Sequence, residues 1–154
     1  MRLTIYFHID ELARDAVVAS NLKQIVGLSD VELVYGNRQT SAWLDQSGRA
    51  FDLCIMPSVD FLATYWPEPK RMLQTVILPA EQIMNSRAAS NDRIVAKFLG
   101  SYPDKMRPWV ERVSVFLFWG PGAMAAVLEL RPDLEPKCHV VGHPRFDYRC
   151  VGKR

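Results

Sequence analysis

Several features that would assign a protein to a familiar class are scarce or missing in this sequence. Only three cysteines occur among 154 residues, Cys54, Cys138 and Cys150, and no two of them form a CxxC pair. Their odd number and wide spacing argue against a zinc site and against a disulfide framework. Because Cys54 and Cys138 lie in apolar runs, we expect both to be buried free thiols.

A strong excess of positive or negative charge is also lacking. Nineteen basic residues stand against seventeen acidic ones, so the net charge is only +2. Proteins that bind nucleic acid or membrane surfaces through charge carry a much stronger positive bias. The sequence therefore gives no support for a nucleic-acid partner.

Long hydrophobic runs are absent as well. No apolar segment approaches the roughly 20 residues that cross a bilayer. The opening "MRLTIYFHIDE" has a short apolar run followed by acids, without the small-residue cleavage site of a signal peptide. We therefore expect no transmembrane segment and a cytoplasmic location.

The sequence signatures of several common active sites are missing too. There is no GxSxG nucleophile elbow, and no GK[ST] follows the glycines near position 120 as it would in a P-loop. The first strand-to-helix turn, "HIDELARD", contains no glycine, which disfavours a stand-alone dinucleotide-binding domain. Since His8 and His143 are far apart and have no suitable carboxylate spacing, we expect no metal site.

Short apolar runs that alternate with amphipathic segments are what the sequence does contain. Several runs are apolar without alternation, which is typical of strands buried on both faces of a parallel sheet. Helical spacing of apolar residues falls between them. The expected strands cover residues 2–9, 31–36, 51–57, 74–80, 112–120 and 138–144, and the expected helices cover 11–26, 86–102 and 122–132. This pattern predicts one Rossmann-like α/β domain over residues 1–154, a three-layer sandwich with about six mainly parallel strands.

Polar residues, glycine or proline follow every expected strand. In open parallel sheets, ligands bind beyond the carboxyl ends of the strands, near the point where the strand order reverses. With the common order 3-2-1-4-5-6, the first and fourth strands flank that point, and His8, Asp10 and Glu11 would face the end of the fourth strand. The candidate substrate-binding residues at this edge are Arg14, Glu81, Gln82, Trp119, Gly120, Pro121, Gly122, His143, Pro144 and Arg145.

Each of these candidates also has a plainer structural interpretation. Asp10 is a good N-cap for a helix that begins at Glu11, and acidic residues suit a helix N-terminus. His8 directly ends an apolar strand, so it fits a buried, hydrogen-bonded histidine as well as a ligand contact. "WGPG" could be an anion site at a helix N-terminus or only a tight turn. Arg145 could bind a phosphate or carboxylate, or it could pair with Asp147.

Three stretches resemble a known family. "FHIDELARDAVVASNL", "FLFWGPGAMAAVLELRPDL" and "VVGHPRFD" are similar to the N-terminal half of the bacterial surface carbohydrate biosynthesis proteins, which are glycosyltransferases of the GT-B type with two Rossmann domains. The resemblance covers essentially the whole chain. His143 departs from it, because the family often has asparagine there. It implies an acceptor-side domain whose donor-binding second domain is absent from this chain or is a separate chain.

The resemblance also implies a reaction. It would be glycosyl transfer in the assembly of capsule, lipopolysaccharide or a related glycan, from a nucleotide sugar to a glycan or lipid-linked acceptor, without a bound metal or other cofactor. Asp10 or Glu11 would be the general base, with His8 as the alternate. Gly120 to Gly122 and His143 to Arg145 would border the interdomain cleft. Such an enzyme works in the cytoplasm or at the inner face of the membrane. The alternative is a truncated, non-catalytic binding or interaction module.

Overall fold

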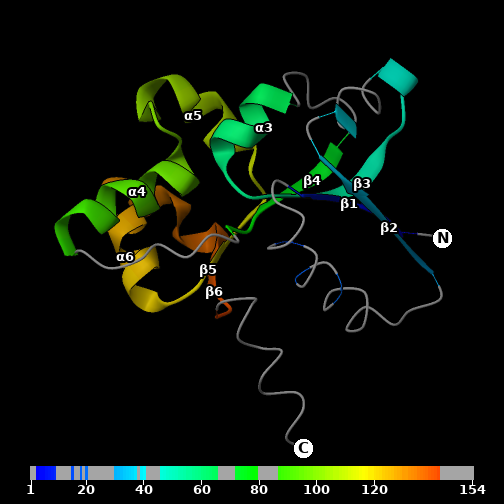
Figure 1. Ribbon diagram of the computed structural model, residues 1–154. Helices are drawn as coiled ribbons and strands as arrows, with labels where there is room; N and C mark the ends of the chain where they lie inside the picture. Colours follow the sequence, from blue (N-terminus) through cyan, green and yellow to red (C-terminus); the bar gives the residue numbers. More distant parts are fainter. Residues whose placement is uncertain are drawn as a thin grey trace, which may run out of the picture.

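Six parallel strands make up the sheet that runs through the molecule (Figure 1). The computed structural model describes residues 3–9, 15, 18, 20, 30–37, 39–40, 46–65, 72–79 and 87–142. The strands are β1 (Leu3–His8), β2 (Val31–Gly36), β3 (Phe51–Met56), β4 (Met72–Ile77), β5 (Val115–Phe118) and β6 (Cys138–Val140). The predicted α/β fold with a parallel six-stranded sheet is confirmed.

The helices between these strands pack on the sheet. They are α3 (Val59–Tyr65), α4 (Arg87–Leu99), α5 (Pro103–Arg112) and α6 (Pro121–Leu130), followed by the 3-10 helix η2 (Pro132–Lys137). Two of them, α3 and α5, are not among the helices expected from the sequence. Pro103 occupies the first turn of α5, where its missing N–H costs no helical hydrogen bond. Within the described ranges, none of the helices is both long and apolar enough to span a membrane.

The order of the strands differs from the one assumed in the sequence analysis. It is β2-β1-β3-β4-β5-β6, not 3-2-1-4-5-6. β1 pairs with β2 from Leu3↔Val31 onward and with β3 from Ile5↔Leu53 onward, so the order reverses between β1 and β3. The expectation that the first and fourth strands flank the reversal is therefore wrong, because β3 lies between them.

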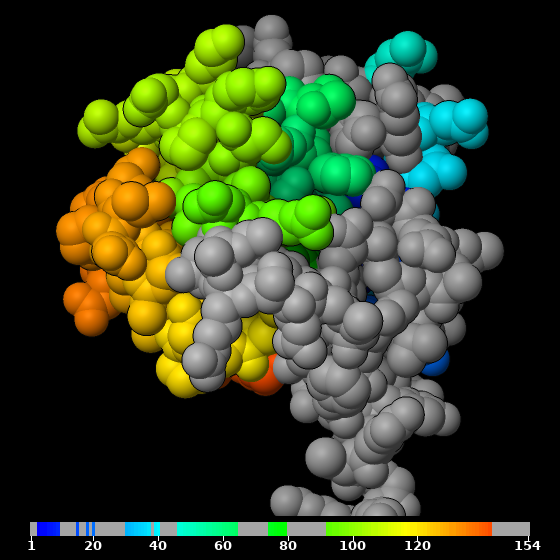
Figure 2. Space-filling view, turned by 60° about the vertical axis from the view of Figure 1, so that its left-hand side comes forward, coloured from blue at the N-terminus to red at the C-terminus, as the bar shows by residue number. Residues whose placement is uncertain are grey.

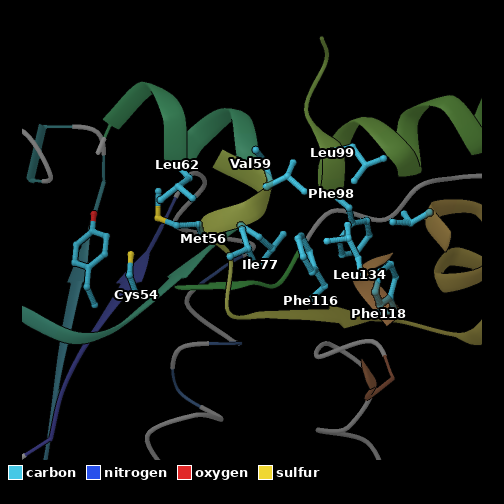
Figure 3. Packing of buried hydrophobic residues seen from close by; sticks show 14 of the residues in the cluster. Cys54, Met56, Val59, Leu62, Ile77, Phe98, Leu99, Phe116, Phe118 and Leu134 are labelled. Carbon is cyan, nitrogen blue, oxygen red and sulfur yellow. The ribbon is translucent and has the colours of Figure 1, made fainter. Parts of the chain in front are cut away.

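The larger hydrophobic core lies between the sheet and helices α3 to α6 (Figure 3). Side chains alternate along each strand, so Tyr6 and His8 of β1 share one face while Ile5 and Phe7 share the other. Phe98 of α4 stacks on Phe118 of β5 with a centroid separation of 4.1 Å. This packing holds α4 over β5.

A smaller core lies on the opposite face. Ile5, Phe7, Ile55, Val76 and Leu78 are buried there together with Val18, which is 2% exposed. The sheet is thus covered on both faces, as expected for parallel strands.

Candidate functional site

The carboxyl ends of all six strands lie at one edge of the sheet, because every pair of neighbouring strands is parallel. Among the sequence-predicted site residues, the structure describes His8 at the end of β1 and the turn from Trp119 to Gly122 after β5. Both lie at this carboxyl edge. The other predicted residues lie outside the described part of the chain: Asp10, Glu11, Arg14, Glu81, Gln82, His143, Pro144 and Arg145.

His8 is a buried histidine held by aromatic neighbours. It is 3% exposed, and its Nδ1 lies 3.3 Å from the hydroxyl oxygen of Tyr6. Phe61 of α3 meets the imidazole edge-on, with 5.2 Å between the ring centroids. A side chain in this position orients the end of β1, and contact with a substrate would require it to become exposed. The geometry therefore agrees with the structural interpretation of His8.

The end of β2 packs closely against the same tyrosine. The Tyr6 hydroxyl donates to the Asn37 carbonyl oxygen at 3.5 Å. The Asn37 side-chain oxygen accepts hydrogen bonds from the backbone N–H groups of Gln39 and Thr40, at 3.0 and 3.1 Å, which is the pattern of a helix N-cap. A Cβ atom at Gly36 would lie 2.9 Å from the Tyr6 ring and 2.6 Å from Thr40. Glycine is needed at the end of β2 for this close approach.

Ser58 follows β3 and is also used internally. It is 3% exposed, and its hydroxyl oxygen accepts a hydrogen bond from the Phe61 N–H at 3.3 Å. Serine in this position caps the N-terminus of α3. Ser58 and His8, the two described polar side chains next to the strand-order reversal, therefore stabilise the fold around it.

The turn after β5 has a different character. The indole N–H of Trp119 donates to the Pro79 carbonyl oxygen at 2.6 Å, which ties the end of β5 to the end of β4. Gly120 has extended backbone angles (φ −169°, ψ 168°) and precedes α6 without a side-chain cap, and Pro121 is the first helical residue. A Cβ atom at Gly120 or Gly122 would have no described atom within 4 Å.

The two glycines are thus required neither by packing nor by a left-handed backbone. They leave the first turn of α6 uncovered by side chains of its own. Among the described residues, no atom would contact a side chain at either glycine, next to the partial positive charge of the helix N-terminus. An approaching anionic or hydroxyl-bearing group would meet little steric resistance from the described residues at this turn.

The described thiols are not nucleophiles. Cys54 is fully buried, and this burial raises the pKa of its thiol far above the ordinary value. Burial, together with the charge of Glu135, raises the pKa of Cys138 to about 11. The expectation of a buried free thiol is confirmed for Cys54, whereas Cys138 is only half-buried. Reactive cysteines have lowered pKa values, so neither thiol fits catalysis.

The described residues contain no group of three or more histidine, cysteine or acidic side chains that could hold a metal ion. The chain was also compared with known proteins, and no family model, no curated protein and no solved structure matches it. The comparisons therefore neither support nor refute the family resemblance expected from the sequence.

Proposed function

We propose that this domain is the acceptor-side half of a glycosyltransferase that acts in cell-surface polysaccharide biosynthesis. The observation that carries the proposal is the open turn from Trp119 to Gly122, at the carboxyl edge of a parallel sheet. Ligands of open α/β sheets bind at this edge. The stretch that resembles the glycosyltransferase family includes this turn, from Phe116 onward.

In the proposed reaction, a carboxylate directly after β1 acts as the general base. Asp10 or Glu11 takes the proton of the acceptor hydroxyl, and the hydroxyl oxygen forms a bond to the anomeric carbon of the sugar donor. The bond from that carbon to the nucleoside diphosphate breaks, and the diphosphate leaves. Buried His8 keeps the end of β1 in place through Tyr6, which makes it a positioning residue rather than the base.

The donor in this proposal is a nucleotide sugar, and the acceptor is a glycan or a lipid-linked glycan. A second Rossmann-like domain or chain supplies most of the donor site. The open turn at Gly120 and Gly122 would border the cleft between the two domains and approach the donor phosphates. No bound metal or other cofactor enters the proposed reaction. The site of action is the cytoplasm or the inner face of the membrane.

A specific observation favours a second candidate, the non-catalytic binding module. Next to the strand-order reversal, the described polar side chains of His8 and Ser58 are buried and hydrogen-bonded. A site of this kind can bind a glycan without offering a base to it. The two candidates share the carboxyl edge and differ in turnover.

The experiment combines glycine variants with a binding and a turnover measurement. Gly120→Ala and Gly122→Ala should leave the fold intact, because the added methyl groups meet no described atom within 4 Å. If a ligand approaches this turn, both variants should weaken the binding of glycans or nucleotide sugars. Binding is monitored by the NMR shifts of the amide groups of Trp119, Gly120 and Gly122. Unchanged binding in both variants, or shifts confined to the amino ends of the strands, would contradict the proposed site.

Turnover separates the enzyme from the binding module. The protein is supplied with a donor-side Rossmann domain, and nucleoside diphosphate release from nucleotide sugars is measured. Asp10→Asn keeps a good N-cap, so a fall in rate of roughly 10²–10⁴-fold with unchanged stability would identify a base. Glu11→Gln is tested in the same way. Tight glycan binding without any turnover would favour the module.

A further inference from the structure

A cavity of about 460 Å³ lies away from the carboxyl edge. It opens between α5, the C-terminal ends of α4 and α6, and the start of η2. In Figure 2, α5 (lime) and η2 (orange) are neighbours on the surface that faces the viewer. The cavity is separated from the Gly120 turn by the length of α6, about 15 Å for ten residues. Its volume falls within the range of small-molecule sites, about 300–1,000 Å³.

The base of the cavity is apolar. Leu99 and Val110 belong to the main core and are 2% and 1% exposed. Pro103 and Leu130 form further apolar lining, and Leu130 is 59% exposed although it is a large aliphatic residue. A ligand with an apolar group would cover this surface and remove it from water.

One side of the cavity presents a prearranged guanidinium. Arg131 donates from Nε and Nη2 to the two carboxylate oxygens of Asp133, at 2.8 and 2.7 Å. This bidentate pair fixes the plane of the guanidinium, and the Arg131 side chain is only 21% exposed. Within the part of the chain that the structure describes, Nη1 has no hydrogen-bond partner. The free end of this guanidinium can therefore receive a second carboxylate.

The lining also includes a carboxylate. Asp104 makes no hydrogen bond or ion pair with any described residue. Arg107, one turn further along α5, donates from Nε to Glu111 at 3.0 Å and is directed along its own helix. The Asp104 carboxylate is therefore available to a cationic group of a ligand.

We propose that this cavity binds a small zwitterion of the α-amino-acid type with an aliphatic side chain. Its carboxylate would bind the free end of Arg131, its ammonium group would bind Asp104, and its side chain would lie over Leu130 and Pro103. The lining holds two acids, Asp104 and Asp133, and two bases, Arg107 and Arg131, so its net charge favours neither a simple anion nor a simple cation. The inference is independent of the proposed glycosyl transfer.

The test uses leucine and two analogues that each lack one charge, 3-methylbutylamine and 4-methylpentanoate, in calorimetric titrations of the whole chain. Leucine should bind, and each analogue should bind about ten- to a hundredfold more weakly, since a charged hydrogen-bonded contact is lost. Asp104→Asn should reduce leucine affinity to the level of 4-methylpentanoate and leave the affinity for 4-methylpentanoate unchanged or higher. Glu129→Gln, which removes a neighbouring exposed acid outside the cavity lining, is the matched control and should bind leucine normally.

Arg131→Gln removes the guanidinium but also breaks the pair with Asp133, so loss of binding in this variant could reflect loss of the fold. The second variant is therefore Leu130→Ala, which removes an exposed side chain and should weaken the binding of leucine more than the binding of glycine. The proposal is overturned if leucine gives no binding signal at about 10 mM, a concentration at which ligands with affinities of about 4 kcal/mol or more are detected. It is equally overturned if Asp104→Asn and Leu130→Ala, both correctly folded, bind leucine as the natural protein does.

Discussion

Gly100→Ala should destabilise the protein strongly, because two independent features of the structure require glycine there. Gly100 ends α4 with φ +86°, in the left-handed region, and its N–H donates to the Ala96 carbonyl oxygen at 2.9 Å. A residue with a Cβ atom pays roughly 1–2 kcal/mol for this conformation. Its added methyl group would also overlap the Met106 side chain of α5 and approach Asp60 Oδ1 to 3.2 Å.

The strained backbone conformation and the steric overlap both destabilise the folded protein. Overpacking of this kind typically costs about 1–3 kcal/mol, so the free energy of unfolding should fall by about 2–5 kcal/mol in total. For a domain of this size, Tm changes by roughly 2–4 °C per kcal/mol, which corresponds to a decrease of roughly 4–20 °C. Urea denaturation and thermal melting followed by circular dichroism both report the change.

Gly122→Ala is the matched control. The substitution is chemically identical, but Gly122 lies inside α6 without a positive φ and has no described atom within 4 Å of an added Cβ. Alanine there should leave stability unchanged or raise it by up to about 1 kcal/mol, because it is the better helix former. The reasoning is refuted if Gly100→Ala stays within about 0.5 kcal/mol of the natural protein, or if both variants lose similar stability.

Three further outcomes follow from the packing. Phe98→Ala should reduce the free energy of unfolding by about 3–5 kcal/mol in urea denaturation, because Phe98 is 2% exposed and stacks on Phe118; a loss below about 1 kcal/mol would contradict this. Trp119→Phe keeps a ring but leaves the Pro79 carbonyl without its 2.6 Å donor, so it should cost about 1–3 kcal/mol and shift amide resonances at the ends of β4 and β5. Cys138 should react with iodoacetamide at pH 8 about a hundredfold more slowly than a thiol of pKa 9.0, and its rate should rise with pH up to about 11, as measured by mass spectrometry.

The fold was predictable because unbroken apolar runs mark strands that are buried on both faces. The order of the strands was not, because pairing is decided by contacts between distant segments. Polar residues within the strands do not reveal it either: Glu32 and His139 lie in β2 and β6 at the two ends of the sheet, but Asp52 lies in central β3.

The side-chain alternation of β1 could have predicted the burial of His8. Tyr6 and His8 are two residues apart and share a face, so a buried tyrosine implies an inward-facing histidine. The charged cavity near Arg131 could not be predicted from the sequence, for a different reason. It depends on α5, which is not among the helices expected from the sequence, and on how that helix packs near Arg131.

The strand order has a consequence for how the chain assembles during synthesis. Once β1 and β3 have paired, β4, β5 and β6 join the same growing edge in the order in which the ribosome releases them. None of the described strands has to insert between two that are already paired. Each addition closes a loop of moderate length and buries the previously exposed edge, which shortens the time that an unpaired strand is open to aggregation. The last of the described strands, β6, has only three residues and therefore offers few backbone groups for pairing with other chains.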